Sequence, residues 1–107
     1  RDDAVSSAET VATQMPVQAA HVIVEALELV VVTGDRIRPT VVSDIYGGAA
    51  LLRGALTGVL LAVDINLKSG QSQSEEALSA DREDVFRRGK AAYAAIRIQA
   101  KAAGYEI

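Results

Sequence analysis

The sequence contains no cysteine, no tryptophan and a single histidine among its 107 residues. Without cysteine, the chain forms no disulfide, binds no metal through thiolates and uses no cysteine nucleophile. The lone histidine, His21, also excludes a histidine-based zinc site. We therefore expect no metal centre of these kinds. The lack of cysteine is consistent with a reducing compartment, and we expect a cytoplasmic protein.

Aromatic residues and prolines are also rare, with three tyrosines, one phenylalanine and two prolines. Alanine, by contrast, accounts for 19 of the 107 residues, and an alanine-rich chain with few aromatic residues favours helix over strand. Half of the residues are hydrophobic, and a chain of this length forms one small domain. We predict a single all-α domain over residues 1–107, built as a bundle of long helices.

Positive charge and long apolar runs are scarce as well. The formal net charge is −3 and the pI is about 5.0, whereas a nucleic-acid-binding surface needs an excess of lysine and arginine. The longest uncharged apolar run, residues 54–63, is shorter than the roughly 20 residues that cross a membrane, and the acidic start is unlike a signal peptide. We expect a soluble protein that binds neither nucleic acid nor membrane.

Apolar periodicity and helix-breaking residues divide the chain into four predicted helices. Pro16 predicts a break because the residue before a proline avoids the helical region. Gly34 and Gly104 are expected to cap the helices that precede them. The expected helices cover residues 4–14, 17–32, 44–67 and 74–103, with an extended link over 36–42 and a polar loop over 68–74.

The spacing of apolar residues also predicts which positions face the core. In the second helix the alternatives Ile23 and Val24 remain open, and in the last helix Val85 and Phe86 remain open. Val30 and Val31, and Ala92 and Tyr93, are open in the same way. The other inward positions are Ala20, Leu27, Ile96 and Ala100, and the third helix carries a bulky face beside its small residues, formed by Leu52, Leu56, Val59 and Val63.

The predicted helix over 44–67 carries a stripe of small residues at every fourth position: Ala50, Gly54, Gly58 and Ala62. Glycine inside a helix costs about 1 kcal/mol relative to alanine, so the stripe predicts close contact with another helix. A ligand groove lined by backbone is the alternative. Because Arg53 and Thr57 are the only polar residues between Gly47 and Val63, we expect this helix to be buried on nearly all sides.

Residues 42–68 resemble the family that joins methenyltetrahydrofolate cyclohydrolase with the cyclodeaminase domain of formiminotransferase-cyclodeaminase. In that family a Ser-Asp pair opens a long alanine-rich helix, which closes on an Asn-Val-x-Ile-Asn stretch. The Met-Pro pair at 15–16 and the final Arg- and Ala-rich helix are also similar. The matching residues fall in register without a gap: Ser43, Asp44, Gly58, Leu61, Val63, Ile65 and Asn66.

The chain departs from the family pattern in two residues and in length. Tyr46 stands where the family has a glycine, and Ala62 replaces the first asparagine of the closing stretch. Family members are about twice as long and begin with a helix that carries a glycine-rich loop. The resemblance covers residues 10–104 and the carboxyl half of the family's fold. It implies a fragment whose bundle is completed by an amino-terminal half or a second polypeptide.

The resemblance implies hydrolysis of 5,10-methenyltetrahydrofolate to 10-formyltetrahydrofolate, or the related formiminotetrahydrofolate cyclodeaminase reaction. The substrate is then a tetrahydrofolate derivative, and neither a cofactor nor a metal is required. Asp44, with Ser43, is the implied catalytic carboxylate, although a Ser-Asp pair at a helix start also serves as a simple cap. A non-catalytic helical assembly module is the alternative function, supported by the small-residue stripe.

Two further residues are candidates for substrate binding. The Asn66 side chain is suited to hydrogen-bond the edge of a pterin ring, or alternatively Asn66 only ends its helix. The Arg53 guanidinium is suited to bind the glutamate carboxylates of a folate, or alternatively it forms an ion pair within the protein. On one straight helix, Asp44 and Asn66 are 22 residues and about 33 Å apart, so either they serve different sites or an antiparallel partner helix joins them. The second arrangement predicts a homodimer.

His21 is expected to be a helix histidine whose ring has a hydrogen-bond partner, and Asp64 is expected to be a surface residue.

Overall fold

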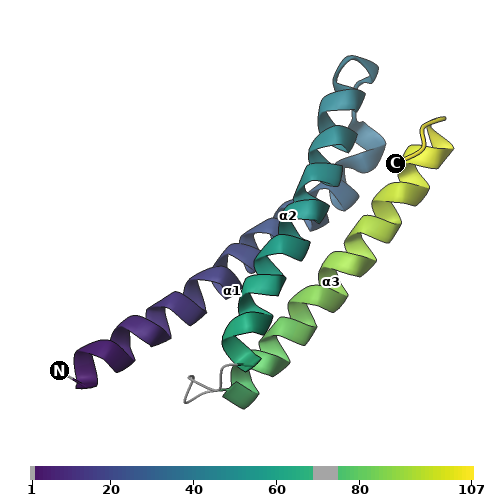
Figure 1. Cartoon of the computed structure of the whole chain (residues 1–107). Helices are drawn as coiled ribbons and strands as arrows, with labels where there is room; N and C mark the ends of the chain where they lie inside the picture. The colour runs from purple at the N-terminus through teal and green to yellow at the C-terminus, as the bar shows by residue number, and fades with distance from the viewer. Residues whose placement is uncertain (1, 69–74) are drawn as a thin grey trace.

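The computed structural model describes residues 2–68 and 75–107, which fold into an elongated bundle of three helices (Figure 1). Two short 3₁₀ turns, η1 (Gly34–Arg36) and η2 (Pro39–Val41), join the first two helices. The second helix runs antiparallel to the other two, and no strand occurs in these residues. The predicted all-α bundle is confirmed. The helices are α1 (Asp2–Thr33), α2 (Val42–Lys68) and α3 (Glu75–Ala102).

Helix α1 continues through Pro16, so the predicted break between two helices at this position is wrong. A proline removes one backbone hydrogen bond, and that loss need not end a helix that packing holds in place. The turns after Pro16 are held in this way, because Val17, Ala20 and Val24 are buried against the other helices. The amino-terminal end of α1 projects beyond the bundle (Figure 1).

Gly34 begins η1 and does not adopt the left-handed conformation of a glycine cap, so the predicted capping role is wrong. Its importance is steric, because a Cβ atom at this position would overlap with the Gln99 side chain. Gln99 Nε2 donates a hydrogen bond to the Val31 carbonyl oxygen at 2.8 Å and so satisfies one of the last carbonyls of α1. Only Ile37 and Arg38 of the predicted link are extended.

The end of α3 is as predicted. Gly104 has a φ of +95°, and its amide donates to the Lys101 carbonyl at 3.0 Å. The Tyr105 amide donates to the Ala100 carbonyl at 2.9 Å, which completes a Schellman motif. This cap turns the chain back toward the bundle, and Ile107 packs against the core. The predicted loop over 68–74 lies outside the described residues from residue 69 onward.

The core runs along the bundle as three clusters of buried side chains. The predicted inward positions Ala20, Leu27, Ile96 and Ala100 are confirmed, and Val24, Val85 and Ala92 are the buried members of their pairs, whereas Val30 and Val31 are both half-buried. On the bulky face of α2, Leu56 and Val63 are buried, and Leu52 and Val59 are half-buried. Ile23 and Phe86 pack at the edge of the middle cluster. The clusters are built on Leu27, Tyr46, Ala49, Ala92, Ile96 and Ala100; on Ala20, Val24, Leu56, Leu60 and Val85; and on Val17, Val63 and Leu78.

Helix α2 is buried on one side only, so the prediction of burial on nearly all sides is wrong. A Cβ atom added at Gly54 or Gly58 would meet only open space, which shows that the small-residue stripe contacts no other described helix. Larger apolar side chains on the same side are also exposed, with Leu51 at 78% and Ile65 at 68%. The outer face of α2 consists of Ala50, Leu51, Gly54, Gly58, Leu61, Ala62 and Ile65.

Two segments are long and apolar enough to cross a membrane by length and composition alone, namely Gln14–Thr33 and Pro39–Lys68. Only 22% of each is buried in the bundle. Core helices of non-membrane proteins meet the same criterion, so the result is weak evidence for a membrane span. It shows that α1 and α2 carry more apolar surface than this bundle covers.

At Gly89, side chains of α1 and α2 pack closely against α3. A Cβ atom here would overlap with Leu56 Cδ2 and lie 3.2 Å from Val24 Cγ2. We expect Gly89→Ala to lower the free energy of unfolding by about 1–3 kcal/mol, because the core must shift to accept the methyl group. Gly48→Ala is the matched control, since a Cβ atom at Gly48 meets open space. It should raise stability by up to about 1 kcal/mol. Urea unfolding followed by circular dichroism measures both, and equal effects would contradict the prediction.

Candidate functional site

Ser43 and Asp44 lie in the first turn of α2, and both side chains are exposed. Neither makes a hydrogen bond or ion pair with another described residue, so neither acts as a side-chain cap. The turn η2 leads directly into α2, which leaves no separate capping position before the helix. By helical spacing, Asp44 shares the outer face of α2 with Gly58 and Ala62. Its carboxylate is therefore available to a ligand or partner.

A pocket of about 270 Å³ lies beside Ser43. One wall comes from η2 and the start of α2, including Pro39, Tyr46 and Gly47. The other wall is the segment after α3, residues 105–107. The Tyr46 and Tyr105 rings lie with their centroids 6.4 Å apart at an interplanar angle of 47°. The pocket thus combines an aromatic pair with a hydroxyl group, and Asp44 does not line it.

Arg53 and Asn66 lie farther along α2. Arg53 is half-buried, and its Nη1 donates to Thr57 Oγ1 at 2.8 Å within the same helix. It forms no ion pair with a described residue, so the alternative of an internal ion pair is not observed. Asn66 is half-buried near the end of the helix and does have a polar partner. One chain therefore brings neither residue to Asp44.

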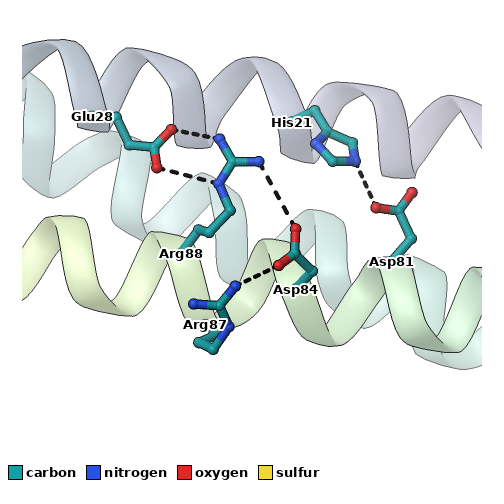
Figure 2. Close-up of polar contacts among 6 residues, drawn as sticks. All are labelled: His21, Glu28, Asp81, Asp84, Arg87 and Arg88. Atoms are coloured by element: carbon teal, nitrogen blue, oxygen red, sulfur yellow. Dashed lines mark hydrogen bonds and ion pairs between the residues drawn. The ribbon is translucent and has the colours of Figure 1, made fainter.

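A row of ion pairs and hydrogen bonds joins α1 to α3 (Figure 2). The Arg88 guanidinium donates two hydrogen bonds to Glu28, one from Nε at 3.2 Å, and lies 4.0 Å from Asp84. His21 Nε2 lies 2.8 Å from Asp81 Oδ1, so the prediction of a satisfied histidine is confirmed. No group of three potential metal ligands occurs in residues 2–68 or 75–107. These contacts hold the two helices in register.

Asp64, predicted as a surface residue, is partly exposed and also pairs with a neighbouring helix. Arg82 donates to both of its carboxylate oxygens, at 2.8 and 2.9 Å, and this pair joins α2 to α3. The same guanidinium lies 5.0 Å from the centre of the Phe86 ring. The hydrogen bonds to Asp64 raise the pKa of Arg82 above its ordinary value. Sequence spacing missed the pair because 18 residues separate its members.

The Glu28–Arg88 pair gives a pH-dependent contribution to stability. The hydrogen bond from Arg88 holds the pKa of Glu28 below its ordinary value, although partial burial opposes this shift. The unfolded chain therefore takes up the proton first as the pH falls. The pair's contribution to the free energy of unfolding is complete above the ordinary glutamate pKa of about 4.3. It is lost as the pH falls from there through the pKa of Glu28 in the folded protein.

We expect Glu28→Gln to lower the free energy of unfolding by about 0.5–1 kcal/mol near pH 7, since both side chains are partly exposed and solvent screens the pair. The difference in the free energy of unfolding between this variant and the wild type should shrink as the pH is lowered toward about 3. Urea unfolding across this range measures it. Glu25→Gln, a change at an exposed residue without an ion pair, is the control. A constant difference at every pH would contradict the linkage.

A sequence model of the formiminotransferase-cyclodeaminase family matches residues 1–84. The chain belongs to this family. The matched range contains the Ser43-Asp44 pair and all of α2, and it ends within α3, whereas the resemblance seen in the sequence extended over 10–104. None of the curated proteins and none of the solved structures matches the chain.

The structure explains one departure from the family pattern and adds one residue to the site. Tyr46 is 5% exposed and fills the core cluster nearest the pocket, so its ring has a packing role. Tyr105, half-exposed at the pocket, was missed by sequence reasoning. The available signal was the apolar pair Tyr105 and Ile107 directly after the Gly104 cap, because apolar residues after such a cap often pack back on the helix.

Proposed function

We propose that this chain acts in folate one-carbon metabolism by hydrolysing 5,10-methenyltetrahydrofolate to 10-formyltetrahydrofolate. The observation that carries the proposal is the exposed Asp44 carboxylate, which pairs with no described residue and belongs to the Ser-Asp pair by which the sequence resembles the family. Membership of the formiminotransferase-cyclodeaminase family supports a tetrahydrofolate substrate.

The chemistry needs one group that accepts and returns a proton. Water adds to the cationic carbon between N5 and N10 while a carboxylate takes one of its protons. The bond from that carbon to N5 then breaks, and N5 receives a proton from the same carboxyl group, while the added hydroxyl loses its proton to solvent and becomes the formyl carbonyl. The product is 10-formyltetrahydrofolate, and one proton is released overall. We assign the carboxylate to Asp44 and the orientation of the substrate to Ser43, Asn66 and Arg53.

A second copy of the chain would complete this site. In a dimer, a second α2 helix would pack antiparallel on this outer face, about a two-fold axis. Each residue of one helix then faces the residue of the other helix that lies equally far from the axis on the opposite side. The midpoint of Asp44 and Asn66 is position 55, and the midpoint of the stripe from Ala50 to Ala62 is position 56. A packing centred on the stripe therefore brings Asp44 of one copy to within two residues of Asn66 of the other, which is about 3 Å along the helix axis. We propose a homodimer with two such sites, in the cytoplasm.

One observation favours a different class of function. The outer face of α2 is apolar and exposed, as in a non-catalytic helical assembly module that binds a second polypeptide, such as an amino-terminal half of the domain. In that case the chain binds its partner without turning over folate. Native mass spectrometry distinguishes a homodimer from a complex with another chain.

The direct test is turnover by the purified protein. Decay of the ultraviolet absorbance of 5,10-methenyltetrahydrofolate, faster than in buffer, is the expected result. Ammonia release from formiminotetrahydrofolate tests the related cyclodeaminase reaction in parallel. If neither substrate reacts and calorimetry detects no tetrahydrofolate binding, the enzyme proposal is wrong and the assembly module is favoured.

A further inference from the structure

The outward side of α1 carries large apolar side chains that the bundle leaves exposed. Met15, Val22 and Leu29 are 62%, 66% and 63% exposed. By helical spacing they lie on the side of α1 opposite the buried Val24. Only 22% of the apolar segment over residues 14–33 is buried. This surface belongs to a different helix from the outer face of α2, and it needs an explanation of its own.

The exposed side chains belong to a seven-residue repeat. From residue 12 to residue 33, small and large residues alternate at intervals of three and four. The same spacing continues in the sequence back to residue 5, so the repeat spans four heptads with no charged residue at any of its positions. Such a repeat forms the seam of a coiled coil, which a second helix covers. We call this row of positions the α1 seam: Val5, Ala8, Ala12, Met15, Ala19, Val22, Ala26, Leu29 and Thr33.

The alternation of small and large residues makes the α1 seam complementary to itself. The small residues occupy one core position of the heptad and the large residues occupy the other. In an antiparallel pair of such helices, each large residue faces a small one, so all layers have a similar width and pack without gaps. A parallel pair would place alanine on alanine and leave every second layer underfilled. A second copy of this chain, packed antiparallel, supplies the matching surface.

Charge distinguishes the two registers that would centre such a pair on the seam. If Val22 faces Ala26 of the second copy, Glu25 of one copy faces Glu25 of the other beside the seam, and the two acids repel each other. If Val22 instead faces Ala19 of the second copy, Glu25 lies beside Gln18 of that copy. The second register also gives the projecting end of α1 a neighbour, because residues 8–14 of one copy lie along residues 27–33 of the other (Figure 1).

A lipid surface fits the α1 seam less well than a second copy does. Helices that lie on membranes carry lysine and arginine on their polar face. Helix α1 has neither residue from Asp2 to Thr33 and carries five acids. An anionic membrane surface would therefore repel it.

We propose that the α1 seams of two copies pair antiparallel, with Val22 of each copy against Ala19 of the other. This contact is separate from the proposed α2 dimer and does not depend on the folate reaction. The paired strip over residues 8–33 is about 38 Å long and one helix wide, which is small for a permanent interface. The dissociation constant is therefore expected to be on the order of 10⁻⁴ M, so the contact forms only at high protein concentration.

Sedimentation equilibrium of the Gly58→Leu variant isolates the α1 contact, because this substitution blocks the proposed α2 contact. The variant should be a monomer of 11.2 kDa at about 10 µM and mainly a dimer at about 1 mM. Adding Val22→Glu should raise the dissociation constant at least tenfold. Adding Ile98→Glu is the matched control, because Ile98 is 71% exposed on α3, and it should leave the association unchanged. Circular dichroism checks that each variant is folded.

Cysteine cross-linking in the same background tests the register, since the chain has no cysteine of its own. A mixture of Met15→Cys and Ala26→Cys should form a disulfide-linked dimer, and neither variant alone should do so. A mixture of Met15→Cys and Thr33→Cys, which pairs only in the other register, should not form one. Cross-linking of the second mixture alone would overturn the proposed pairing.

Three further results would show that the inference is wrong. The first is a Gly58→Leu variant that stays monomeric at about 1 mM. The second is equal weakening of the association by Val22→Glu and Ile98→Glu. The third is flotation with phosphatidylcholine vesicles in place of self-association, which would assign the α1 seam to lipid. None of these results bears on folate turnover, so the proposed function is tested separately.

Discussion

Asp44→Asn should lower kcat for methenyltetrahydrofolate hydrolysis by about 10²- to 10⁴-fold, which is the usual contribution of a general acid-base group. The amide has nearly the same shape as the carboxylate but cannot accept the proton from water. The fold should be unaffected, because Asp44 is exposed and pairs with no described residue. The measurement is the decay of substrate absorbance at saturating substrate.

Asp3→Asn is the control for this change, because Asp3 is also an exposed acid in the first turn of a helix. It removes the same charge and the same helix-terminal interaction, so activity should stay at the wild-type level. A decrease of less than about threefold in Asp44→Asn would contradict a catalytic role. Asp44 would then act only as a favourable charge at the start of α2.

Gly58→Leu should convert the proposed dimer into a monomer, raising the dissociation constant by about 100-fold or more. The added side chain occupies the space through which the second helix backbone approaches the stripe. Within one chain that space is open, so the fold should remain intact. Sedimentation equilibrium measures the association. Ala91→Leu adds similar bulk at an exposed position of α3 and should leave the dimer unchanged.

Mixing two inactive variants tests whether the dimer forms the site. If Asp44 of one copy works with Asn66 of the other, a heterodimer of Asp44→Asn and Asn66→Ala carries one intact site and one doubly altered site. After mixing and exchange, about half of the heterodimer's sites should be active. No recovery, together with a dimer shown by sedimentation, would place both residues in separate sites. A wild type that is monomeric and active would contradict the dimer itself.

The predictable part of the candidate site is the part that lies within one helix. Ser43, Asp44 and Asn66 are predicted from their register along residues 42–68, and Arg53 is predicted as a charged residue in an apolar helix. The pocket was not predictable, because it forms only when Tyr105 meets the start of α2 from the far end of the chain. The same is true of the Arg82–Asp64 pair between helices. Contacts between distant segments leave no periodic signal in the sequence.

The sequence by itself determined the local properties of this protein. Its alanine-rich composition specified helices, its apolar spacing specified core positions such as Leu27 and Ile96, and Gly104 specified the end of α3. Each of these depends on residues within a few positions of one another. The absence of cysteine excluded disulfides, thiolate metal sites and a cysteine nucleophile, and the single histidine excluded a histidine-based zinc site. Neither conclusion depends on the fold.

Only the tertiary structure decided which apolar surfaces are used inside the bundle. Helix α2 is apolar on two sides, and the sequence cannot rank them, because periodicity shows that a side is apolar but not what covers it. Packing selected the side with Leu56 and Val63 and left Gly54 and Gly58 exposed. Packing also carried α1 through Pro16, because the burial of the following turns outweighs one lost hydrogen bond.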